Sequence, residues 1–119
     1  MKFKEIKEHL SKFRVGIAGA GGLGSNCAAA LARSGIGTLV ISDFDVVEPS
    51  NLNRQFYFYD QIGMDKTKAL KVNIERINSG TNIIINNVKL NPENISMIYR
   101  DCDVIVEAFD GANMKEMLV

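Results

Sequence analysis

The chain has 119 residues, of which 46% are hydrophobic and 24% are charged, and its formal net charge is zero. This size and composition predict one globular domain. The balanced charge argues against a generic nucleic-acid-binding protein, because such proteins usually carry an excess of basic residues. No apolar run approaches about 18 residues, and the start lacks the apolar core of a secretory signal. We therefore expect neither a nucleic-acid partner nor a membrane partner.

The two cysteines, Cys27 and Cys102, match no paired metal-binding spacing and no disulfide framework. We expect a reduced, cytoplasmic protein in which both thiols serve in packing. The last ten residues, "DGANMKEMLV", resemble the start of a helix that stops in mid-pattern. Residues 1–119 are accordingly expected to be the N-terminal part of a larger domain.

The first 13 residues predict an N-terminal amphipathic helix. Phe3, Ile6, Leu10 and Phe13 recur at spacings of three and four, which places them along one helix face. This apolar seam could pack on the domain's own sheet, or it could meet a second copy or another partner. The sequence leaves both interpretations open.

Apolar strands alternate with helices along the rest of the chain. This alternation is typical of a parallel sheet covered by helices on both faces. The expected fold class is therefore α/β, with a Rossmann-like, doubly wound, mainly parallel sheet. The expected elements are strands at 14–18, 38–42, within 81–90 and within 103–109, helices at 22–34, 66–78 and near 92–100, an N-cap at Asp65, and an irregular segment from 43 to about 63.

Glycines are concentrated between the first strand and the helix at 22–34. Gly19, Gly21 and Gly24 fit the pattern G-x-G-x-x-G, and Gly22 adds a fourth glycine. Such a loop lets a phosphate approach the backbone at the positive end of a helix dipole. An acidic residue that holds ribose hydroxyls is expected about 20 residues later, and Asp43 occupies that place. The loop predicts nucleotide binding but does not separate NAD from ATP.

The stretch "DFDVVEPSNLNRQ" after the second strand favours ATP. It brings polar groups and Arg54 back toward the glycine loop, and Lys66 opens the next helix. A cation at a helix N-terminus opposes the dipole by about 0.3–1 kcal/mol. A nearby triphosphate would offset this cost. The alternative is that Lys66 and Arg54 are ordinary solvated side chains.

An acidic residue, Asp110, directly follows the fourth strand. Ligands of doubly wound sheets bind at the carboxyl ends of strands. Magnesium is commonly held there by one or two carboxylates together with phosphate oxygens. Asp110 is therefore the candidate magnesium ligand, and Glu107, within the strand, is a weaker one.

These motifs together resemble one family. The string "GAGGLGSNCAAALARSGIGTLVISDFDVVEPSNLNRQ", followed by "IGMDK" and "EAFD", is similar to the ThiF/MoeB/HesA adenylyltransferases, which are relatives of the ubiquitin-activating enzymes. The resemblance runs from Arg14 to the end of the chain. It is greatest to short ThiF-type members that act on the sulfur carrier protein of thiamine synthesis.

The resemblance implies an ATP-binding domain over residues 1–119, with ATP and Mg²⁺ as cofactors. It implies transfer of AMP from ATP to the C-terminal glycine carboxylate of a ubiquitin-like sulfur carrier with a Gly-Gly tail, with release of pyrophosphate. Catalytic roles would fall to Arg54, Lys66 and Asp110. The implied binding roles are ribose binding by Asp43, phosphate binding by Asn51, Arg54 and Lys66 with Gln55 nearby, magnesium binding by Asp110, and a nucleotide seat formed by Gly19, Gly21, Gly22 and Gly24.

Two alternatives remain beside this interpretation. The glycine loop and Asp43 alone would also suit the nucleotide-binding domain of an NAD-dependent oxidoreductase, and the chain could be a non-catalytic family member. A homodimer is compatible with the resemblance. However, the arginine that many members carry before the first strand has no counterpart here, because Arg14 lies too near that strand. The aromatic run "QFYFYD" at 55–60 could dock the carrier, but we expect it to pack the irregular segment onto the domain.

Overall fold

The computed structural model describes residues 2–108 of the chain. Its centre is a parallel sheet of four strands in the order β3-β2-β1-β4. Ile17 of β1 pairs in register with Ile41 of β2 on one side and with Val106 of β4 on the other. The strands are β1 (Arg14–Ala18), β2 (Thr38–Ser42), β3 (Asn82–Asn86) and β4 (Val104–Glu107).

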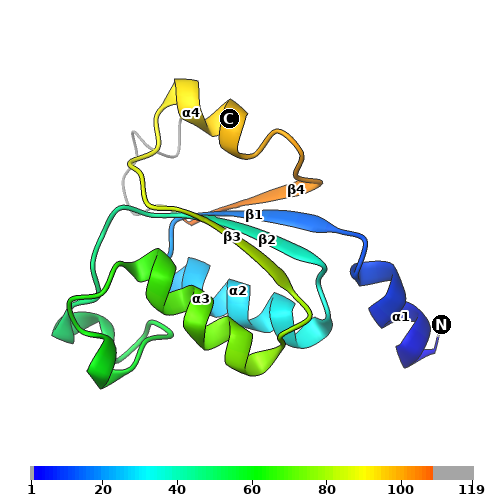
Figure 1. Ribbon diagram of the computed structural model, residues 1–119, viewed down its shortest axis with the longest axis horizontal. Helices are drawn as coiled ribbons and strands as arrows, with labels where there is room; N and C mark the ends of the chain where they lie inside the picture. The colour runs from blue at the N-terminus through cyan, green and yellow to red at the C-terminus, as the bar shows by residue number, and fades with distance from the viewer. Residues whose placement is uncertain (1, 109–119) are drawn as a thin grey trace.

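Helices cover both faces of the sheet, as expected for a doubly wound fold. Figure 1 shows α2 and α3 on one face, α4 on the other, and α1 at the end of the sheet where β1 begins. The helices are α1 (Phe3–Leu10), α2 (Gly22–Ser34), α3 (Lys66–Ile77) and α4 (Pro92–Ile98), and two short 3₁₀ turns, η1 (Pro49–Asn51) and η2 (Tyr59–Gln61), interrupt the long connection from β2 to α3. None of the helices that the structure describes is long and apolar enough to cross a membrane.

The strand order places the change of winding direction between β1 and β4. The chain runs from β1 outward through β2 to β3, and then returns to the far side of β1 to form β4. In open α/β sheets, ligands bind outside the carboxyl ends of the strands at such a switch point. The loop that follows β1 contains the glycines, so the topology puts them at this position.

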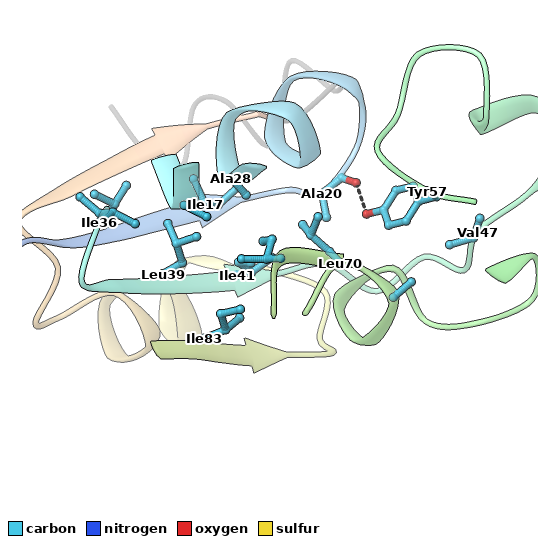
Figure 2. Close-up of a cluster of buried hydrophobic side chains, with 14 residues drawn as sticks. Ile17, Ala20, Ala28, Ile36, Leu39, Ile41, Val47, Tyr57, Leu70 and Ile83 are labelled. Carbon is cyan, nitrogen blue, oxygen red and sulfur yellow. Dashed lines mark hydrogen bonds between the residues drawn. The ribbon is translucent and has the colours of Figure 1, made fainter. Parts of the chain in front are cut away.

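The core consists of two layers, one on each face of the sheet. The larger layer joins Ile17, Leu39 and Ile41 of the sheet to Ala28 of α2 and Leu70 of α3 (Figure 2). The smaller layer lies under α4. Alanines on the buried face of α2 let that helix lie close to the strands. The apolar surface buried in each layer stabilises the fold by roughly 25 cal/mol for every Å² removed from water.

Cys27 and Cys102 pack against the larger and the smaller layer respectively, and both are free thiols. Burial raises the pKa of each thiol above its ordinary value. A raised pKa keeps a thiol protonated and poorly reactive. The prediction that both cysteines serve in packing is confirmed.

Several element boundaries differ from the expected ones. The N-terminal helix ends at Leu10, because the chain turns there to bring Phe13 against the core. Its apolar seam is divided, since Leu10 and Phe13 contact the core layer while Ile6 stays 41% exposed.

Asp65 occupies the N-cap position of α3, as predicted from the sequence, but its carboxylate accepts no capping hydrogen bond and instead lies 3.5 Å from Nζ of Lys68.

The aromatic run divides in the same way. Phe56 and Tyr57 pack against the larger core layer, as predicted. Phe58 and Tyr59 do not, because η2 turns them outward, and they are 46% and 82% exposed. The prediction that the whole run packs the segment onto the domain is therefore wrong for its second half.

The tightest contact in the fold lies between the end of β1 and the start of α2. A Cβ placed on Gly24 would lie only 1.8 Å from the carbonyl oxygen of Gly19. No side chain can be accommodated at that distance, so backbone must meet backbone. Gly19 itself has φ of 106°, a conformation that glycine adopts without steric cost.

This contact predicts that Gly24→Ala separates α2 from β1 and lowers the free energy of unfolding by about 1–3 kcal/mol or more, which is the range for overpacked sites. Chemical denaturation of both proteins would measure the change. Gly22→Ala is the matched control, because a Cβ there meets nothing closer than 4.0 Å. Equal effects of the two substitutions would contradict this account of the packing.

A second prediction concerns the buried hydroxyl of Tyr57, which donates to the carbonyl oxygen of Ala20 at 2.6 Å (Figure 2). Tyr57→Phe leaves that buried carbonyl without its donor, at a cost of about 1–3 kcal/mol in the free energy of unfolding. Tyr59→Phe removes the same atom from an exposed ring and should change the free energy by no more than about 0.5 kcal/mol. Thermal unfolding of the two variants would reveal a difference, and its absence would contradict the assigned role.

Candidate functional site

The glycine loop leads from β1 into α2 at the carboxyl end of the sheet. Its first two amide groups are bound, since Gly19 N donates to the carbonyl of Ser42 and Ala20 N donates to the Asp43 carboxylate. The N–H groups of Gly21 and Gly22 donate to no other described residue. Cβ atoms on these two residues would meet nothing within 3.8 Å, the nearest atoms being 3.9 and 4.0 Å away. The loop therefore offers free donors and open space at the positive end of the α2 dipole.

Asp43 joins the end of β2 to this loop. One carboxylate oxygen accepts the 2.7 Å bond from Ala20 N, and the other accepts a 2.7 Å bond from Asp45 N. The side chain is half-buried. Each carboxylate oxygen has a second lone pair, so Asp43 can still accept hydrogen bonds from a bound hydroxyl. The structure places it beside the glycines, as the sequence predicted.

Residues 54–57 lie against the other side of the loop. The carbonyl of Arg54 accepts a bond of 2.8 Å from Asn26 Nδ2, and Phe56 N donates to Ser25 Oγ at 3.0 Å. The Tyr57 hydroxyl reaches Ala20 (Figure 2). Burial, and secondarily the Asp43 carboxylate, raises the pKa of Tyr57, so its hydroxyl remains a donor. The sequence predicted that this segment returns to the loop, but it did not reveal the three contacts that hold it.

Gln55 is buried in this segment and has an unmet polar group. It is 8% exposed, and its Oε1 has no hydrogen-bond partner among residues 2–108. Its Nε2 is 3.9 Å from the place where a Cβ of Gly21 would be. A buried amide without partners is costly. Nε2, which lies on the side of the loop, can donate to an acceptor of a ligand there.

Arg54 and Asn51 are placed differently. The Arg54 guanidinium is exposed and donates to the carbonyl of Ser50 at 3.3 Å, so its backbone rather than its charged group meets the loop. Asn51 is buried, and its Oδ1 accepts from Glu48 N at 2.8 Å while its carbonyl accepts from Gln55 N at 2.9 Å. In this structure Asn51 closes the turn that presents the next residues, a role the sequence did not show.

Lys66 is the first residue of α3, and its side chain is only 6% exposed. The alternative of a solvated lysine is therefore wrong. No carboxylate within the described part of the chain forms an ion pair with it, although its backbone N donates to the carbonyl of Asp45 at 3.0 Å. Burying an ammonium without a counter-charge costs several kcal/mol. A bound anion at the start of α3 would offset that cost.

The predicted metal ligand Asp110 lies outside the described residues. Glu107, the weaker candidate, pairs in register with Ala18 at the end of β4 and is half-buried. Within residues 2–108 no group of three or more His, Cys, Asp or Glu side chains could hold a metal ion by itself. The described residues thus bring together free backbone donors, the Asp43 carboxylate and a buried lysine, without a metal-binding cluster of their own.

Comparison with known proteins agrees with this geometry. The model of the ThiF family matches residues 3–119. The chain is 34% identical over 113 residues to the adenylyltransferase and sulfurtransferase MOCS3 of Caenorhabditis briggsae, covering 94% of this chain and 28% of that protein. It is equally identical over the same length to the molybdopterin-synthase adenylyltransferase of Haemophilus influenzae, covering 94% of this chain and 46% of that protein.

Solved structures show the same fold. The E. coli tRNA N6-threonylcarbamoyladenosine dehydratase TcdA, in complex with ATP, has a TM-score of 0.92 at 27% identity and covers 98% of this chain and 49% of its own. E. coli MccB with ATP has a TM-score of 0.85 at 29% identity, over 95% of this chain and 35% of its own. The chain therefore spans less than half the length of these relatives. With the family model matching residues 3–119, this chain belongs to the ThiF family.

Proposed function

We propose that this chain binds ATP on its glycine loop and forms the adenylating part of an enzyme that activates a ubiquitin-like sulfur carrier ending in Gly-Gly. The observation that carries the proposal is the buried Lys66, which forms no ion pair with a described carboxylate and whose backbone N–H donates to the carbonyl of Asp45. A triphosphate carries more negative charge than the pyrophosphate of NAD and therefore suits a buried cation better. A triphosphate supplies the charge that Lys66 lacks.

In this proposal, some of the described residues bind the ribose of ATP and others bind its phosphates. Asp43 accepts hydrogen bonds from the ribose hydroxyls with its remaining lone pairs. The free N–H groups of Gly21 and Gly22 face the phosphates, and Nε2 of Gln55 donates to a phosphate oxygen there. Lys66 stabilises the negative charge of the phosphates, and Arg54 joins it after its guanidinium leaves Ser50.

The reaction is an in-line displacement. A carboxylate oxygen of the carrier's terminal glycine attacks the α-phosphorus, the bond between that phosphorus and the bridging oxygen breaks, and pyrophosphate leaves with the bond's electron pair. The resulting acyl adenylate is a far better electrophile than the carboxylate, so a sulfur nucleophile can attack it next. Such transfers depend on positioning and charge stabilisation. A magnesium ion, held by Asp110 and phosphate oxygens, would supply further positive charge.

The pathway is a separate proposal. Short ThiF-type members, which the sequence resembles, favour the carrier of thiamine synthesis, whereas one relative is named a molybdopterin-synthase adenylyltransferase. Both carriers end in the same chemical group and require the same adenylation. We propose the thiamine carrier as the substrate, with the molybdopterin carrier as the direct comparison.

Binding can be tested first with the unaltered chain. At a concentration one hundred times the Kd, ATP with Mg²⁺ should raise the free energy of unfolding by about 2.7 kcal/mol, because only the folded chain binds it. Thermal unfolding with ATP, with NADH and with neither would measure this stabilisation. Stabilisation by NADH alone would favour the oxidoreductase alternative.

The catalytic proposal is tested by ATP–pyrophosphate exchange in the presence of a Gly-Gly carrier. Lys66→Met should lower the exchange rate by about 10²-fold or more, the usual loss when one group that stabilises a developing charge is removed. Without ATP the same variant should melt at a higher temperature, because it no longer buries an unpaired charge. Lys68→Met, two residues along the same helix and 64% exposed, is the control for both measurements.

Three results would each decide between the alternatives. Exchange that is unchanged in Lys66→Met would remove this lysine from the mechanism. ATP binding without exchange, with either carrier and also in a longer protein that contains this chain, would identify a non-catalytic member of the family. Exchange with one carrier alone would identify the pathway.

A further inference from the structure

A pair of buried amides connects the irregular segment to α3. Gln61 Nε2 donates to Asn73 Oδ1 at 2.7 Å, and Asn73 Nδ2 donates back to Gln61 Oε1 at 3.0 Å. The two residues are 6% and 2% exposed. Two amides that face each other in this way fix each other's orientation, since turning either one would bring two donors or two acceptors together.

The same two side chains also hold backbone groups on both sides. Asn73 Nδ2 donates to the carbonyl of Phe56 at 2.9 Å, and Gln61 Oε1 accepts from Phe58 N at 3.0 Å. Gln61 Nε2 lies 3.4 Å from the carbonyl of Ala69 in α3. A fully bonded buried network specifies one arrangement of its parts, which an apolar contact of the same size would not do.

This network connects the two segments whose residues are proposed to bind the phosphates. On one side, Phe56 is the residue directly after Arg54 and Gln55, and its N–H is bound to Ser25 at the start of α2. On the other side, Asn73 lies seven residues after Lys66, which is about two turns of α3 and the same face of the helix. The bond from Asn73 to the Phe56 carbonyl therefore links the helix that carries Lys66 to the segment that carries Gln55.

We propose that Gln61 and Asn73 are a positioning pair, which sets the place of Arg54 and Gln55 relative to Lys66 and thereby sets the affinity for the triphosphate without contacting the nucleotide. The inference rests on the proposed function, because it requires ATP to bind between these groups. Asp43, which faces the ribose, is attached to the glycine loop and not to this network. The pair should therefore act on the phosphates and leave the nucleoside contacts intact.

The proposal can be tested because it affects the phosphate contacts and not the nucleoside contacts. Calorimetric titration of the chain with Mg·ATP and with adenosine gives two Kd values for each variant. Asn73→Leu should weaken ATP binding by about tenfold, since small misplacements of phosphate-binding groups are costly. It should change adenosine binding by less than about twofold. Gln61→Met, which keeps the bond from Asn73 to Phe56, should produce a smaller loss in the same direction.

The matched control is Ile74→Val, the residue next to Asn73 on α3, which is fully buried in the core. It removes one methylene and lowers stability without touching the amide pair. All titrations are made at a temperature where circular dichroism shows each variant folded. If Asn73→Leu does not fold, Gln61→Met decides the question, and if neither folds the role of the pair is structural and the proposal is overturned.

The outcomes distinguish a failure of the proposed function from a failure of the positioning role alone. If the unaltered chain binds no ATP, the proposed function fails, and the inference fails with it. If the unaltered chain binds ATP and Asn73→Leu binds it equally well, the inference alone is overturned. Equal losses for ATP and adenosine, or the same selective loss in Ile74→Val, would also overturn it.

Discussion

The backbone contact between Gly19 and Gly24 determines where every other part of the site can lie. Because a Cβ on Gly24 would lie 1.8 Å from the Gly19 carbonyl oxygen, α2 begins directly against the end of β1. The helix dipole is thereby aimed at the edge of the sheet between β1 and β4. The glycines that follow Gly19 then have their N–H groups in the open, and Asp43 at the end of the neighbouring strand is close enough to bind Ala20 N.

The long segment between β2 and α3 is held by three kinds of contact. Backbone hydrogen bonds such as that from Val47 N to the carbonyl of Met64 fold it on itself, and Val47 and Tyr57 bury apolar surface in the core. Polar side chains then attach it to the helices and to the glycine loop. Ser25 and Asn26 bind it from α2, Asn73 binds it from α3, and Tyr57 binds the glycine loop from within it. Each of these bonds contributes modestly, but together they define one position. A surface loop of this length would otherwise sample many conformations.

The sequence predicted the secondary structure and the glycine motif far better than it predicted these side-chain contacts. The strands, helices and parallel arrangement follow from apolar patterning, and the spacing of the glycine motif and Asp43 predicted that they meet at the carboxyl ends of β1 and β2, as they do. The burial of Lys66 could not be predicted, because a lysine at a helix start is ordinarily solvated. Nor could the division of the aromatic run, since Phe56 and Phe58 have the same side chain and only the turn at η2 separates a packed ring from an exposed one. Long-range hydrogen bonds such as that of Asn73 to Phe56 have no pattern in sequence spacing.

The buried polar groups differ in whether they have hydrogen-bond partners. Most buried polar side chains are bonded, including Thr81 to the Ile36 carbonyl and Asn73 to Gln61. The buried side-chain atoms without a partner within residues 2–108 are the amide oxygen of Gln55, the hydroxyls of Ser42 and Thr67, and Nε of Arg14 at the start of β1, and Lys66 has no counter-charge among these residues. A chain selected only for stability would not keep such groups buried. Under the proposed function, a bound triphosphate would recover the free energy that the unpaired charge of Lys66 costs, so affinity for the ligand and instability without it would share that origin.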